Sequence, residues 1–267
     1  MSSVHFSINF DKVVIPPCPV VVMGMLREMK KEEPDLERVV ALISRDPALT
    51  ISILKTVNSP LFGYARKVIE VRNAVMTLGL NKSMSIAMAC KVQDLGRQNV
   101  NAPRVWEHSR KVAEISAKLF KHAGIRSSTA DTAYTAGLLH DVGIFLLLDQ
   151  SEYSDNLMQA DLLSDAEASN HSELGALILE KWGMPDIVSQ ATRYHHAVES
   201  IPDSLPIENA YMAAVVNLAE RVECLISSPF QGDELMFSDS SKVSLELLGI
   251  SEDDFIDIQS DLLGDVA

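Results

Sequence analysis

The sequence has few cysteines, few basic residues and no long apolar run, and each shortage excludes a class of protein. The three cysteines, Cys18, Cys90 and Cys224, are widely spaced and include no Cys-x-x-Cys pair, which indicates reduced thiols and argues against a disulfide framework. Apolar stretches such as residues 20–23 are far shorter than the roughly 20 residues that span a membrane. The N-terminus lacks the basic and apolar pattern of a signal peptide. We therefore expect a cytoplasmic protein without a membrane span.

Basic residues are outnumbered by acidic residues, 23 against 37, and the formal net charge is −14. A field of this sign repels a phosphate backbone, which argues against nucleic acid as the main partner. Much of the excess lies at the C-terminus, where residues 231–267 contain ten acidic residues and one basic residue, Lys242. The rest of the chain is only mildly acidic, so its composition does not exclude a local basic patch there. We expect the acidic tail to be a solvated helix or a flexible end.

Strand alternation is also scarce, whereas helical periodicity recurs almost everywhere, so we predict an all-α fold. The first firm helix is expected after Asp35 and the next at Asp46-Pro47, because an aspartate side chain caps free amides and proline fits the first turn. A further helix is expected over 71–78, ending at Gly79. The later part of the chain predicts helices near residues 104–122, 128–148, 171–182, 185–197, 206–226 and 252–263.

The polar segment 95–103 is the best candidate for a boundary within the chain. We predict an N-terminal helical subdomain over residues 1–100, a second helical subdomain over 101–228 and an acidic helical tail over 229–267. The hydrophobic fraction of 47% and the charged fraction of 22% fit a globular protein with a sizeable core.

Five of the seven histidines and one aspartate lie on successive predicted helices: His108, His140, Asp141, His171, His195 and His196. The stretches on both sides of His140-Asp141 are apolar, and a buried carboxylate is costly unless it is paired or bound to a cation. Imidazole and carboxylate ligands suit iron, zinc, nickel or manganese. Two such ions bridged by the carboxylate could polarise a water for attack on phosphorus.

A structural role is the alternative for each of these residues taken alone. A buried histidine bonded to a neighbouring carboxylate is common. The doublet His195-His196 would also suit a helix C-terminus, where an imidazolium complements the helix dipole. The recurrence of the pattern over successive helices makes the whole set stronger evidence for a metal site than any single member.

The histidines stand in motifs that together resemble the HD superfamily: Trp106-Glu107-His108-Ser109, 136–143, 171–176, 182–185 and His195-His196. Three segments of the N-terminal half, 46–49, 54–62 and 74–79, resemble the signature of the HDOD family. The similarity covers roughly residues 11–225. It implies an N-terminal helical subdomain packed on an HD-like helical bundle. It also implies a bacterial signalling role, as an output or adaptor module working with histidine kinases, response regulators or diguanylate-type proteins.

Similarity to the related HD-GYP phosphodiesterases implies which residues would bind metal: His108, His140, Asp141, His171, His195 and His196. Glu220 stands where that family has a final aspartate. The parts that handle phosphate depart from the pattern, because Ile144 replaces a lysine that would hold a phosphate by point charge. Residues 197–202 replace the Gly-Tyr-Pro segment, and Arg104 replaces a glutamate before the first histidine.

These departures favour a signalling module without catalysis that holds one or two divalent transition-metal ions in the HD cavity. The alternative is a metal-dependent phosphohydrolase acting on a nucleotide or a cyclic dinucleotide, in which Asp141 would be catalytic.

Overall fold

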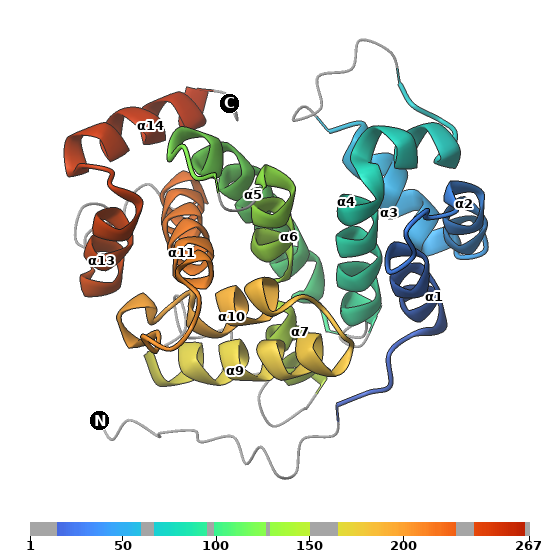
Figure 1. Ribbon diagram of the computed structural model, residues 1–267, viewed down its shortest axis with the longest axis horizontal. Helices are drawn as coiled ribbons and strands as arrows, with labels where there is room; N and C mark the ends of the chain where they lie inside the picture. Colours follow the sequence, from blue (N-terminus) through green and yellow to red (C-terminus); the bar gives the residue numbers. More distant parts are fainter. Residues whose placement is uncertain are drawn as a thin grey trace.

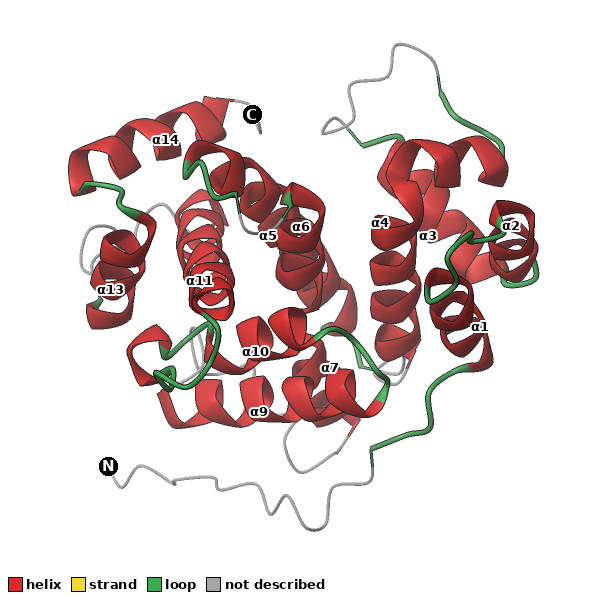
Figure 2. Ribbon diagram, viewed as in Figure 1, coloured by secondary structure: helices red, strands yellow, loops and turns green. Residues whose placement is uncertain are grey.

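The structure is a computed structural model that describes residues 15–59, 67–94, 99–126, 129–149, 165–227 and 238–264. Within these ranges every regular element is a helix, which confirms the predicted all-α fold (Figure 2). The described part of the chain contains no helix that is both long and apolar enough to cross a bilayer. The parts of the predicted motif and boundary at residues 60–62 and 95–98 lie outside the described residues.

The N-terminal helices are α1 (Val20–Met29), α2 (Leu36–Ser44), α3 (Pro47–Val57) and α4 (Val71–Gln93). Asp35 and Asp46 accept hydrogen bonds from backbone amides in the first turns of α2 and α3, as expected. Gly79 (φ 79°) has non-helical backbone angles and divides α4 at a kink into two helical parts, so a helical stretch ends there as expected. The sequence did not predict α1, whose N-terminal flank, Pro19, offers no side-chain acceptor.

The second half of the chain forms a helical bundle: α5 (Ala102–His122), α6 (Ala130–Leu139), α7 (Val142–Asp149), α9 (Asp165–Lys181), α10 (Asp186–Tyr194), the 3-10 turn η4 (Val198–Ser200) and α11 (Ile207–Ser227). The acidic tail adds α13 (Asp239–Leu248) and α14 (Glu252–Gly264). Figure 1 shows α4 between the N-terminal helices and α6 of the bundle.

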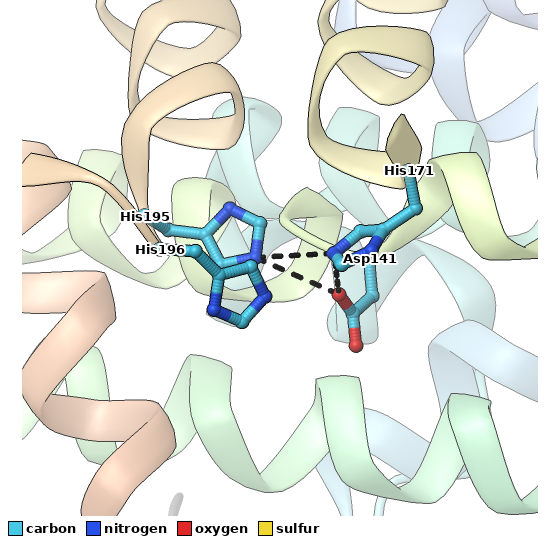
Figure 3. A group of neighbouring side chains, drawn as sticks. All are labelled: Asp141, His171, His195 and His196. Atoms are coloured by element: carbon cyan, nitrogen blue, oxygen red, sulfur yellow. Dashed lines mark hydrogen bonds and ion pairs between the residues drawn. The ribbon is translucent and has the colours of Figure 1, made fainter. Parts of the chain in front are cut away.

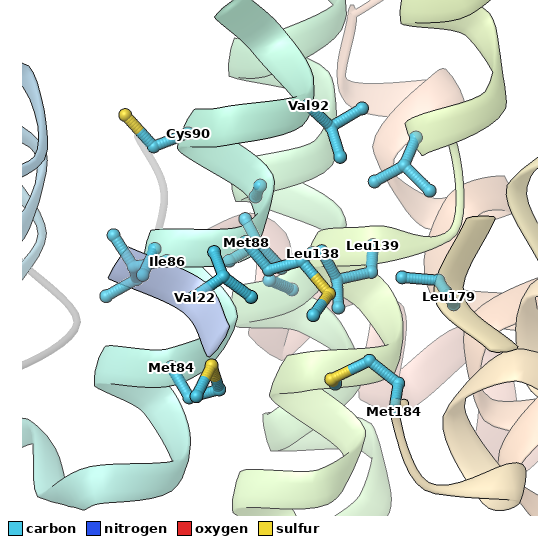
Figure 4. Close-up of a cluster of buried hydrophobic side chains, with 14 of the residues drawn as sticks. Val22, Met84, Ile86, Met88, Cys90, Val92, Leu138, Leu139, Leu179 and Met184 are labelled. Carbon is cyan, nitrogen blue, oxygen red and sulfur yellow. The ribbon is translucent and has the colours of Figure 1, made fainter. Parts of the chain in front are cut away.

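One buried hydrophobic cluster joins the N-terminal helices to α6, α7 and α9. Figure 4 shows side chains from both halves in this cluster, including Val22, Met88, Leu138 and Leu179. The backbone also links the halves, because the indole of Trp182 donates a hydrogen bond to the carbonyl of Pro16 at 3.0 Å. The N-terminal helices therefore pack directly on the bundle, while the subdomain boundary near residue 100 stays a prediction.

The helices of the acidic tail pack on the bundle. A second buried cluster combines α5, α10 and α11 with Leu245, Leu248 and Phe255 of the tail. Phe255 is completely buried. The expectation of a solvated or flexible tail is therefore wrong for the described tail helices, because one face of each carries apolar residues while the acidic residues occupy the other.

Two predicted helix positions around the histidines are also corrected. The expected helix over 128–148 is interrupted, because α6 ends at Leu139 and α7 begins at Val142, so that His140-Asp141 lies in the break. The helix α9 starts at Asp165, which places His171 inside the helix instead of at its start.

Candidate metal centre

One carboxylate lies at the centre of a buried cluster of imidazoles. Oδ1 of Asp141 lies 3.1 Å from Nε2 of His171 and 3.8 Å from Nε2 of His195. Its other oxygen, Oδ2, lies 3.2 Å from Nε2 of His140 and 3.5 Å from Nε2 of His108. The two oxygens thus divide four imidazoles into two pairs that come from distant parts of the chain.

All seven residues that the sequence singled out lie in this cluster: His108, His140, Asp141, His171, His195, His196 and Glu220. They form three overlapping groups in which the candidate ligand atoms lie within 4.8 Å of one another. The groups draw on α5, the break between α6 and α7, α9, the end of α10, and α11. Figure 3 shows three of the imidazoles around the Asp141 carboxylate. Their role as metal ligands stays a prediction.

Two of the imidazoles are oriented by the ends of their own helices. Nδ1 of His140 donates to the carbonyl of Gly137 at 2.8 Å, and Nδ1 of His195 donates to the carbonyl of Thr192 at 2.7 Å. Both carbonyls belong to last turns, where carbonyls lack a partner within the helix. A carbonyl only accepts, so Nδ1 carries a proton, and each ring in its neutral form presents the Nε2 lone pair to the cluster. This is the usual arrangement of metal-binding histidines.

The structure adds Glu223, a residue that the sequence did not single out. Nδ1 of His108 donates to Oε2 of Glu223 at 2.7 Å, and Nζ of Lys111 donates to Oε1 at 3.2 Å. A carboxylate behind the ring directs Nε2 of His108 toward Asp141, as second carboxylates do in metal sites. Glu223 lies one helical turn after Glu220 on α11, and this spacing is the signal that could have revealed it.

The sequence matches the HDOD domain family over residues 15–198. The chain belongs to the HDOD family. This confirms the resemblance drawn from the motifs. The HDOD chain is 26% identical over 200 residues to an uncharacterised protein of Treponema pallidum, in an alignment that covers 71% of this chain and 39% of that protein. The chain therefore spans well under half of the length of this curated relative.

Solved structures share the HDOD fold. An HDOD domain protein of unknown function from Geobacter sulfurreducens superposes with a TM-score of 0.69 at 24% identity, over 95% of this chain and 90% of that chain. A Shewanella amazonensis protein, whose name proposes a metal-dependent phosphohydrolase, superposes with a TM-score of 0.66 at 19% identity, over 96% and 94% of the two chains. At these identities the likeness establishes the fold alone.

Burial and charge set the protonation states of the cluster in the HDOD chain. Burial lowers the pKa of His195 well below its ordinary value, and neighbouring imidazoles add to the effect. Burial likewise lowers the pKa of His196 to about 4. Burial also acts to lower the pKa of His140, but Asp141 outweighs it and raises this pKa to about 9. The pKa of Asp141 is held well below its ordinary value, because His140 and His171 outweigh its burial. The imidazolium–carboxylate pair of His140 and Asp141 thus lies near two imidazoles, His195 and His196, that resist protonation.

The donor set fits a divalent transition metal. Nε2 of His196 and Oε2 of Glu220 are buried and form no hydrogen bond. A buried polar atom without a partner costs roughly 1–3 kcal/mol, and a cation would satisfy both. Imidazole nitrogen with carboxylate oxygen suits iron, zinc, nickel or manganese better than magnesium or calcium. The side chains of His108 and His196 remain 21% and 20% exposed, which gives the cluster two edges open to solvent.

We expect the metal-free protein to be most stable against unfolding near pH 6.5. The folded-state pKa of His196, about 4, lies below the ordinary 6.5, so folding releases a proton and stability falls as the pH falls through this range. The shift corresponds to about 3 kcal/mol, and His195 acts in the same direction. His140 acts oppositely, because its raised pKa contributes stability below pH 6.5 that is lost as the pH rises to about 9.

Urea unfolding in the presence of a chelator, at several pH values between about 4.5 and 9, measures this profile. The substitution His196→Asn should make the loss of stability on the acidic side smaller and leave the alkaline side unchanged. A profile that rises steadily from the acidic to the alkaline end would contradict the assignment of the raised pKa to His140.

Proposed function

We propose that this HDOD chain is a non-catalytic signalling module that holds a divalent transition metal in its histidine cluster. The observation that carries the metal site is the Asp141 carboxylate, which lies among four imidazoles whose Nε2 atoms face it. Asp141 would hold one ion together with His171, His195 and His196. It would hold a second ion together with His108 and His140, and Glu220 forms a third group with His140 and His195.

The apolar residue next to the cluster supports a role without catalysis. Ile144 stands where the resemblance to phosphodiesterases places a phosphate-holding lysine, and it is 7% exposed within the hydrophobic cluster that joins the two halves. Its side chain therefore contributes to packing. A bound metal would supply Lewis acidity and positive charge, while the surrounding residues would hold it without a lysine at this position to orient a phosphate.

The signalling part of the proposal follows from the family. The resemblance associates HDOD domains with histidine kinases, response regulators and diguanylate-type proteins, and we propose one of these as the partner. The three cysteines are free thiols, in keeping with a reducing cytoplasm. A metal-dependent phosphohydrolase acting on a nucleotide or cyclic dinucleotide is the second candidate, favoured by the convergence of the whole predicted ligand set.

Elemental analysis combined with turnover assays separates the two candidates. We expect protein loaded with Fe²⁺, Mn²⁺, Zn²⁺ or Ni²⁺ to retain one or two ions per chain after desalting. We expect no hydrolysis of bis(p-nitrophenyl) phosphate or of a cyclic dinucleotide above the level of the Asp141→Asn variant. Metal-dependent turnover that this variant abolishes would establish the phosphohydrolase, and protein that retains none of the four metals would contradict both candidates.

A further inference from the structure

The tail helix α13 lies outside the part of the chain that matches the family, and it contacts the turn η4, which follows His195 and His196 in the chain. Nδ2 of Asn217, on α11, donates to the carbonyl of His195 at 2.7 Å. Oδ1 of the same amide accepts a hydrogen bond from the hydroxyl of Ser244, on α13, at 3.1 Å. All three residues are completely buried. A continuous chain of hydrogen bonds therefore runs from the tail to a candidate metal ligand.

A second contact ties the same segment to the same helix. The amide of Val198 donates to Oγ of Ser240 at 3.2 Å. Ser240 and Ser244 are one turn apart on α13, so their hydroxyls face the same side of the helix. The Ser244 hydroxyl also lies 2.9 Å from the carbonyl of Ser240 and shares its proton between the two acceptors. The tail thus holds the backbone on both sides of His196.

The amide of Asn217 is oriented by its partners. The carbonyl of His195 can only accept, so the nitrogen of the amide faces it and the oxygen faces α13. The carbonyl of Thr192 holds Nδ1 of the same histidine, so that both the backbone and the ring of His195 are fixed. Loss of the Asn217 contact would free the backbone while the ring stays anchored, and Nε2 would change direction.

We propose that Asn217 and Ser244 are positioning residues of the metal centre, through which the tail helix α13 sets the affinity of the site for metal. The inference rests on the proposed metal binding. In this proposal α13, which lies beyond the family match, helps to align His195 and His196 with the Asp141 carboxylate. The alternative is that the two residues only satisfy each other as buried polar groups, with an effect on folding but none on the site.

A pair of serine substitutions in one helix separates these roles. Ser241 is as buried as Ser244, but its hydroxyl contacts Ser238 at 2.9 Å and lies outside the chain of bonds to His195. We expect Ser244→Ala to weaken Zn²⁺ binding about tenfold and Asn217→Leu by roughly 10- to 100-fold, the range found for residues that orient metal-binding histidines. Ser241→Ala should lower the Tm comparably to Ser244→Ala and leave Zn²⁺ affinity unchanged.

Competition titrations of the full metal-free chain with Zn²⁺ and a chelator give the affinities, and thermal unfolding gives the Tm values. Equal Zn²⁺ affinity in Ser244→Ala and Ser241→Ala would overturn the positioning role. If the unaltered chain binds none of Fe²⁺, Mn²⁺, Zn²⁺ and Ni²⁺, the proposed metal function fails, and the imidazole ¹H–¹⁵N resonances of the metal-free protein test the inference separately. A shift of the His195 and His196 ring signals in Ser244→Ala, with His140 unmoved, supports positioning, and unmoved His195 and His196 signals contradict it.

Discussion

Replacing Asp141 with asparagine is expected to weaken metal binding by at least about a hundredfold, because residues that merely orient ligands already account for 10- to 100-fold effects. Asparagine keeps the shape of the side chain but removes the negative charge and replaces one ligand oxygen with an amide. Both oxygens face imidazoles: Oδ1 faces His171 and His195, and Oδ2 faces His140 and His108. The substitution therefore affects every ion that the cluster would hold.

The metal-free chain should still fold, although it loses the stability that the Asp141–His140 pair contributes near neutral pH. Asp141 is the group that raises the pKa of His140, so in its absence His140 loses its proton and no uncompensated buried charge remains near neutral pH. Elemental analysis and chelator competition measure the metal affinity, and circular dichroism checks the fold. Asp203→Asn, the same change at an exposed loop residue, is the control. If the Asp141→Asn variant binds as many ions as the unaltered chain, with unchanged affinity, the Asp141 carboxylate is not a metal ligand.

The substitution Gly143→Ala is expected to destabilise the fold by about 4 kcal/mol or more, which is exceptional for a single change. A Cβ at position 143 would lie 2.0 Å from the carbonyl oxygen of His171 and 2.8 Å from the amide nitrogen of Gly175. Both neighbours are backbone atoms of α9, so a side-chain rotation cannot relieve the overlap. The start of α7 would have to move away from α9, and Asp141 would separate from His171.

Thermal or urea unfolding measures the loss, which corresponds to a decrease in Tm of roughly 10 °C for a chain of this size. Gly24→Ala provides a matched control, because its Cβ would meet only the flexible end of Leu42, at 2.9 Å. Gly24 lies within α1, where alanine favours the helix by about 1 kcal/mol and offsets part of the contact. Similar Tm values for the two variants would show that the α7–α9 contact is looser than the backbone geometry indicates.

The protein's sequence alone determined the helical class and the identity of the candidate ligands. Helical periodicity and the caps at Asp35 and Asp46 depend on contacts within three or four residues, so the pattern contains the information needed to place those helices. The imidazoles and the His140-Asp141 pair were recognisable because such residues are costly in apolar surroundings unless they have a partner.

Only the tertiary structure decided how these groups meet. The division of the imidazoles between the two oxygens of Asp141, the support of His108 by Glu223 and the packing of α13 all join residues far apart in the chain. The close approach of α7 to α9 at Gly143, next to the break at His140-Asp141, likewise joins distant parts of the chain. Local sequence patterns do not predict such contacts, because the geometry of the contacts is set by how whole helices bury their apolar faces against one another.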